Sequence, residues 1–135
     1  MTTNFPFARL FYSNPKNVFL LDGIGAVVSA IFLGIFLVQL QPYIGMPTSI
    51  LQTLGVMAFC YAIYSLCCYF FLNKTWSPFL KIIAAANLMH CLITIYLIFN
   101  HFESLTALGI FYFVVEIIIV VWVALLEFKV AKAIA

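Results

Sequence analysis

Four long apolar stretches constrain this chain more than any other feature of its sequence. They cover residues 18–40, 50–72, 79–99 and 104–126, with only short connectors between them. Each is long enough to cross a bilayer core, which takes about 20 apolar residues in a helix. Only 7% of the residues are charged and 67% are hydrophobic, whereas about a quarter of the residues of a soluble domain are charged. The sequence therefore predicts an all-α integral membrane protein, a four-transmembrane-helix antiparallel bundle in which residues 1–135 form a single domain.

The basic residues predict which way the chain crosses the membrane. All six fall on the same side of the four predicted spans: Arg9, Lys16, Lys74, Lys81, Lys129 and Lys132. The connectors at 41–49 and 100–103 contain no lysine or arginine. Because positively charged loops stay in the cytoplasm, we expect both termini to be cytoplasmic and the protein to be multi-pass in a bacterial inner membrane. A net charge of +2, which the topology already explains, leaves no basic patch for a nucleic acid.

Prolines and polar residues mark where two of the helices should begin. Asn14 stands in the N-cap position ahead of Pro15, and Ser77 stands in the same relation to Pro78. The preceding segment, 4–13, is apolar with one arginine and fits a short helix along the cytoplasmic interface. The first apolar stretch is too long for the core of a cleavable signal peptide, so we expect it to remain as a span.

Polar and ionisable residues lie near the centre of the predicted spans, where hydrocarbon would surround them. Glu116 is central in the fourth span and His90 in the third, and a charge at that depth costs about 2.5–3.5 kcal/mol on insertion scales. The polar faces should therefore turn inward and meet, with Glu116 and His90 sharing a proton. The candidate ligand- or proton-binding residues are Glu116, His90, Asn87, Tyr61, Tyr64, Tyr112 and Asp22.

These residues also have a purely structural interpretation. Hydrogen bonds among buried polar side chains hold membrane helices together at roughly 0.6 kcal/mol each, without any ligand. For Asp22, near the cytoplasmic end of the first span, the simpler interpretation is an ion pair with Lys81. The alternative makes Asp22 the cytoplasmic mouth of a proton path that passes Asn87 and reaches the His90–Glu116 pair.

Other features of the sequence point to packing rather than to chemistry. Ala26, Ala30 and Gly34 form a ridge of small residues on the first span, which we expect to pack inside the bundle rather than in a dimer. The four cysteines form no C-x-x-C pair and are expected to be buried thiols. His90 is the only histidine at membrane depth, so we expect no haem, no metal and no other cofactor.

Two classes of function fit this sequence. The first is a small transporter or ligand-binding protein for a proton or a small amphipathic molecule, which the titratable pair favours. The alternative is a non-catalytic accessory or assembly subunit of a larger membrane complex, which the small size and the lack of internal repeats favour. An intramembrane enzyme that shuttles protons with Glu116 and His90 is the least expected of the three. The expected partners are membrane lipid, a small amphipathic ligand, and a second copy of the chain or a larger membrane complex.

Overall fold

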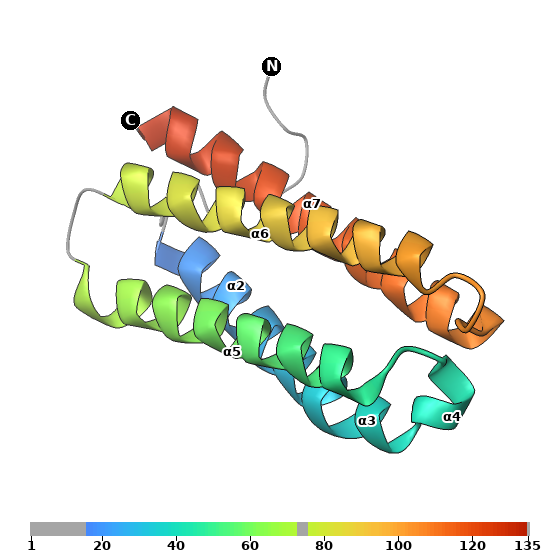
Figure 1. Cartoon of the computed structure of the whole chain (residues 1–135). Coiled ribbons are helices and arrows are strands. Elements are labelled where there is room, and N and C mark those ends of the chain that lie inside the picture. Colours follow the sequence, from blue (N-terminus) through green and yellow to red (C-terminus); the bar gives the residue numbers. More distant parts are fainter. Residues whose placement is uncertain (1–15, 73–75, 135) are drawn as a thin grey trace.

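The computed structural model describes residues 16–72 and 76–134, and the regular structure in this part of the chain is entirely helical (Figure 1). The helices are α2 (Lys16–Ile31), η1 (Phe32–Phe36), α3 (Leu37–Gln39), α4 (Gln41–Ile44), α5 (Thr48–Phe71), α6 (Trp76–Asn100) and α7 (Ala107–Ile134). The all-α prediction is therefore confirmed for these residues. The expected interfacial segment at 4–13, the cap at Asn14 and Pro15, and Lys74 lie outside the described residues.

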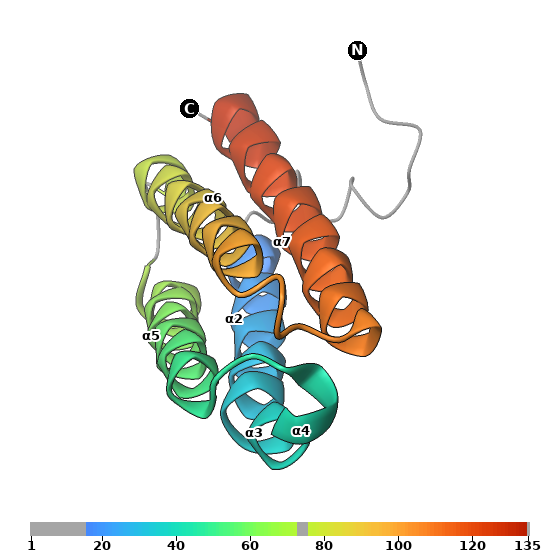
Figure 2. The same cartoon turned by 45° about the vertical axis from the view of Figure 1, so that its right-hand side comes forward.

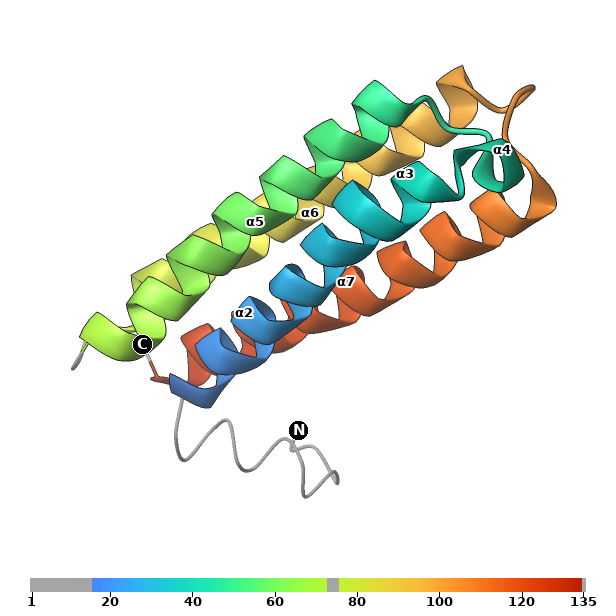
Figure 3. The same cartoon turned by 90° about the horizontal axis from the view of Figure 1, so that it is seen from below.

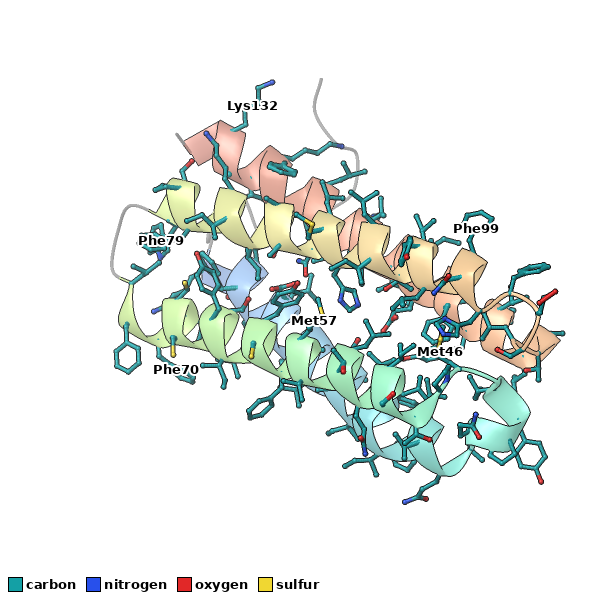
Figure 4. All side chains as sticks on the ribbon, viewed as in Figure 1. Met46, Met57, Phe70, Phe79, Phe99 and Lys132 are labelled. Carbon is teal, nitrogen blue, oxygen red and sulfur yellow. The ribbon has the colours of Figure 1, made fainter. Side chains whose placement is uncertain are left out.

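Within residues 16–72 and 76–134, four helical segments are long and apolar enough to cross a membrane, as the sequence predicts. They are Lys16–Gln39, Thr48–Phe71, Trp76–Asn100 and Ala107–Ala133. Their outer faces carry large apolar side chains, such as Phe70 and Phe99, which point away from the bundle (Figure 4). A continuous apolar surface of this kind suits lipid tails rather than water, and it marks a multi-pass membrane protein.

The four long helices associate as two pairs. α2 packs along α5, and α6 packs along α7, whereas contacts between the two pairs are fewer (Figure 1, Figure 2). One apolar core joins the starts of α2 and α6 to the ends of α5 and α7, with the buried residues Val18, Phe19, Cys68, Leu80 and Val130 among its members. A second core joins the opposite ends, with the buried residues Leu33, Ile44, Leu51, Leu54 and Phe113 among its members. On α6, the buried Asn87 and His90 lie between the levels of these two cores.

The pairing of α2 with α5 depends on small residues. A Cβ atom added at Gly55 of α5 would lie 3.0 Å from the backbone nitrogen of Gly34 and 3.4 Å from the carbonyl oxygen of Ala30. Ala30 and Gly34 of the small-residue ridge therefore pack against α5, as the sequence predicts, while both stay only half-buried. Gly34 itself lies in the π-helical segment η1, whose wider turn interrupts the α-helical hydrogen bonding of this span.

Hydrogen bonds join the two helix pairs at the end of the bundle that carries α4 (Figure 3). Thr106 caps α7, because its side-chain oxygen accepts from the backbone N–H of Gly109 at 3.1 Å. The same hydroxyl donates to the carbonyl oxygens of Tyr43 and Ile44, and the Thr106 N–H donates to the Ile44 carbonyl at 3.0 Å. Gly45 ends α4 in the left-handed conformation, with φ of 92°, and so turns the chain toward α5.

The opposite end of the bundle is joined through side-chain hydroxyls. α6 already includes Trp76, so Ser77 lies inside the helix, and the prediction that Ser77 caps it is wrong. The Ser77 hydroxyl instead donates to the carbonyl oxygen of Ala131 in α7 at 2.7 Å. The Tyr64 hydroxyl donates to the carbonyl oxygen of Phe79 at 3.1 Å, which ties α5 to α6.

Candidate functional site

One polar side chain from each of the four long helices meets at a single place inside the bundle. We call this group the inner cluster: Asp22 of α2, Ser65 of α5, Asn87 of α6 and Glu127 of α7. The Ser65 hydroxyl donates to Oδ2 of Asp22 at 2.5 Å. The side-chain nitrogen of Asn87 donates to Oδ1 of Asp22 and to Oε1 of Glu127, at 3.0 Å in each case. Asn87 thus bridges two carboxyl groups that come from different helix pairs.

The inner cluster holds two acidic groups away from water. Asp22 is only 6% exposed and Glu127 is fully buried, and Oε2 of Glu127 has no hydrogen-bond partner. Both oxygens of Asp22 accept from neutral side chains, while Lys81 is exposed. The prediction of an Asp22–Lys81 ion pair is therefore wrong, and no described basic side chain offsets the two acids.

The geometry of the bridge makes two full negative charges unfavourable. The bridged oxygens of Asp22 and Glu127 both lie 3.0 Å from the same nitrogen, so they are at most about 6 Å apart. Two carboxylates at about 6 Å repel by about 3 kcal/mol at an effective dielectric constant of about 20. A shared proton or a bound cation removes this repulsion.

A cavity of about 70 Å³ borders the inner cluster and extends through the middle of the bundle. All four long helices contribute to its wall, and its polar lining consists of Asp22, Ser29, Tyr61, Asn87 and His90. The rest of the lining is apolar. This volume has room for about two water molecules, at about 30 Å³ each. The cavity thus brings together four of the predicted site residues, namely Asp22, Tyr61, Asn87 and His90.

Glu116 lies outside the inner cluster and has a different partner from the expected one. Its Oε2 atom accepts from the hydroxyl of Tyr112, one turn away on α7, at 3.3 Å. Its Oε1 atom and the Nδ1 atom of His90 are both buried without a hydrogen-bond partner, so the expected bond between these two described side chains is not formed. The two residues still lie at similar heights, because Sγ of Cys91 is 4.0 Å from the carbonyl oxygen of Ile117.

Of the two predicted tyrosines on α5, Tyr61 lines the cavity and Tyr64 contacts a neighbouring helix. The ring of Tyr61 meets the imidazole of His90 edge-on, with ring centroids 5.9 Å apart, and both side chains line the cavity. Tyr64 directs its hydroxyl to the backbone of Phe79 and contributes no lining to the cavity. Tyr64 therefore holds helices together, whereas Tyr61 is the tyrosine that lines the cavity.

Sequence reasoning misses Glu127, which belongs to the inner cluster. The fourth apolar stretch ends at residue 126, whereas α7 continues to Ile134. Glu127 follows Glu116 by eleven residues, which is close to three full helical turns, so both carboxyl groups lie on one face of α7. That spacing is the signal in the sequence that identifies Glu127 as an inward-facing residue.

Comparison with protein-family models, with curated proteins and with solved structures finds no match to this chain. Among residues 16–72 and 76–134, no group of three or more His, Cys, Asp or Glu side chains is placed to hold a metal ion. The four cysteines are free thiols, two exposed on outer faces and two buried: Cys60, Cys67, Cys68 and Cys91. The chemistry of the site therefore follows from the inner cluster and the cavity themselves.

Proposed function

We propose that this chain is a small membrane transporter or ligand-binding protein that binds a proton at the inner cluster. The supporting observation is the Asn87 bridge, which joins two buried carboxyl groups with no described basic side chain beside them. One added proton cancels the repulsion between the two carboxylates. Oε2 of Glu127 is the expected proton-carrying atom, because the other three carboxyl oxygens already accept hydrogen bonds.

Proton binding at this site is coupled to the contact between the two helix pairs. Asp22 belongs to the α2–α5 pair and Glu127 to the α6–α7 pair, so loss of the proton creates repulsion between the pairs. A repulsion of about 3 kcal/mol shifts an equilibrium between two arrangements by roughly a hundredfold. A transporter requires two arrangements of this kind, each favoured by a different ligand state.

The size of the cavity limits what accompanies the proton. About 70 Å³ accommodates a small polar group but not a whole drug-sized molecule, which needs a pocket of roughly 300 Å³ or more. We therefore propose an amphipathic ligand whose polar end enters the cavity, beside Asp22 and Tyr61. Its apolar part would lie against the helices and the lipid.

We also propose antiparallel spans with both termini in the cytoplasm of a bacterial cell, the protein lying in the inner membrane. One apolar core collects the starts of α2 and α6 with the ends of α5 and α7, which supports alternating directions. The described lysines belong to those same helix ends: Lys16, Lys81, Lys129 and Lys132. The positive-inside rule then places this end, and with it the inner cluster, in the cytoplasmic half.

Infrared difference spectroscopy of the protein in lipid, between acidic and alkaline buffer, tests the proton site. A carboxyl group that gains a proton develops a C=O stretching band that shifts in D₂O. We expect Glu127→Gln to abolish this band and Asp22→Asn to alter it, because the two groups share one proton. Glu103→Gln is the matched control, since Glu103 is exposed in the α6–α7 connector. A band that survives unchanged in Glu127→Gln and in Asp22→Asn refutes the proposal.

An accessory subunit of a larger membrane complex is the alternative, and one surface feature favours it. An apolar groove of about 680 Å³ lies between the first span and α5, with Ala30, Gly34, Gly55 and Phe59 in its lining. Small residues allow another helix to approach closely, so a span of a second protein fits this groove. Native mass spectrometry of the gently extracted protein separates the two roles. A small ligand that Asn87→Leu loses supports our proposal, whereas a bound protein without a small ligand supports the alternative.

A further inference from the structure

We propose that the central cavity holds water and conducts protons between the inner cluster and a second, outer station formed by His90 and Glu116. This inference rests on the proposed function, because it takes the inner cluster to be a proton-binding site. It adds a route between two levels of the bundle interior and assigns roles to two buried groups outside the cluster.

The cavity joins Asp22 and Asn87 of the inner cluster to His90 of the outer station. Asp22 and Asn87 line it on the side of the inner cluster, and His90 lines it one helical turn further along α6. Ser29 and Tyr61 supply further polar atoms along the wall. A buried water molecule needs two to four polar partners, and this wall offers enough of them for about two waters.

Unpartnered buried atoms mark the outer station. Nδ1 of His90 and Oε1 of Glu116 have no hydrogen-bond partner, and both side chains are about 95% buried. Leaving a buried polar atom unpaired costs about 1–3 kcal/mol, so two such atoms at one level of the bundle require an explanation. The contact between Cys91 and Ile117, the next residues along each helix, places His90 and Glu116 at a similar level of α6 and α7. A proton held between Nδ1 of His90 and Oε1 of Glu116 would give both atoms a hydrogen-bond partner.

The proposed transfer conserves protons and uses no other reactant. An O–H bond breaks at the inner cluster, and the proton passes to a cavity water, which gives up a different proton to a ring nitrogen of His90. Once a change of rotamer brings these two unbonded groups into contact, the imidazolium releases the proton on Nδ1 to the carboxylate of Glu116 and becomes neutral again. Tyr61 from α5 and Tyr112 from α7 are the tyrosines that contact these groups, and Tyr112 holds the Glu116 carboxyl by its hydrogen bond.

Proton flux into vesicles tests this path. The full chain is reconstituted into liposomes that contain a pH-sensitive dye, and valinomycin with a potassium gradient supplies the driving potential. Ala58 is buried and lines the cavity, so Ala58→Leu fills the space with carbon while keeping every titratable group. Ala85→Leu is the matched control, because Ala85 lies on the exposed face of α6. We expect Ala58→Leu to lower the flux about tenfold or more and Ala85→Leu to conduct like the parent.

A second variant keeps the test decisive if Ala58→Leu does not fold. His90→Gln retains a polar side chain but cannot take up and release a proton, and we expect the same loss of about tenfold or more. Parent vesicles that leak no faster than protein-free vesicles overturn the path, as do folded variants at both positions that conduct like the parent. The infrared band of the inner cluster then distinguishes failure of the proton path from failure of the proton-binding site. A band that depends on Glu127 without any flux leaves the proton site standing and removes only the path.

Discussion

Replacing Asn87 by leucine removes the bridge at the centre of the inner cluster. Leucine has the branched shape of asparagine and the same number of side-chain heavy atoms, so it replaces the amide with a modest gain in volume, but it donates no hydrogen bond. Two bonds of 3.0 Å disappear, one to Asp22 and one to Glu127. Asp22 keeps the bond from Ser65, whereas both oxygens of Glu127 become unpartnered.

The expected loss of stability follows from the two lost hydrogen bonds and the unpartnered carboxyl group. Hydrogen bonds between membrane helices contribute about 0.6 kcal/mol on average and at most about 1.7 kcal/mol, because the unfolded chain in the membrane finds other partners. Two such bonds give about 1–3 kcal/mol, and the fully unpartnered carboxyl of Glu127 places Asn87→Leu toward the upper end of that range. We therefore expect a loss of about 2–3 kcal/mol in the free energy of unfolding.

Steric trapping or detergent-induced unfolding in bicelles measures this loss. Asn100→Leu is the matched control, because Asn100 is the same residue type at the exposed end of the same helix. Combining Asn87→Leu with Glu127→Leu should cost less than the sum of the two single losses, since the second change removes the unpartnered carboxyl. If Asn87→Leu is as stable as Asn100→Leu, the bridge contributes nothing and the assignment of the inner cluster as a coupled unit is wrong.

Two further predictions concern the packing and the topology. Gly55→Ala brings its Cβ to 3.0 Å from the Gly34 backbone, so it should lower the free energy of unfolding by about 1–3 kcal/mol. Gly25→Ala is the control, because its Cβ meets nothing within 4 Å and should cost no stability. The same unfolding assay compares the two variants. A cysteine at Tyr43 should react with a membrane-impermeant maleimide added outside the cell, and one at Pro78 should react only after the membrane is opened. The opposite labelling pattern reverses the proposed orientation.

The number and position of the spans are the part of the fold that the sequence predicts well. The second apolar stretch, 50–72, corresponds to Thr48–Phe71, and the third, 79–99, corresponds to Trp76–Asn100. The agreement has a simple physical cause. The thickness of the hydrocarbon core sets the length of every span, and polar residues end the apolar stretch where the headgroups begin.

The fourth span shows where the same reasoning fails. Hydropathy ends that stretch at residue 126, because Glu127 is an acidic residue of the kind expected outside the hydrocarbon core. In the structure α7 continues and the carboxyl of Glu127 turns inward to Asn87. Hydropathy weighs residue type alone, whereas the free energy depends on whether a partner on another helix is within reach.

The two predicted partnerships fail for a related reason. Depth along each span places Glu116 near His90, and Asp22 near Lys81, but depth fixes neither the rotation of a helix nor the rotamer of a side chain. Glu116 bonds to Tyr112 on its own helix, and Asp22 turns inward to neutral partners. Sequence position thus predicts the depth of each group, and the packing of the helices decides which groups bond.

Directional bonds determine how the two helix pairs sit against each other. Burial of apolar side chains gives little preference in a membrane, because lipid tails are as apolar as the side chains they would replace. The hydrogen bonds at the two ends of the bundle, from Tyr64 to the Phe79 carbonyl and from Thr106 to α4, end on backbone oxygens that do not titrate. The central bond, from Asn87 to Asp22, ends on a carboxyl group that does. A change in protonation therefore acts on the middle of the interface while both ends stay joined, so we expect the pairs to bow apart around the cavity rather than to separate.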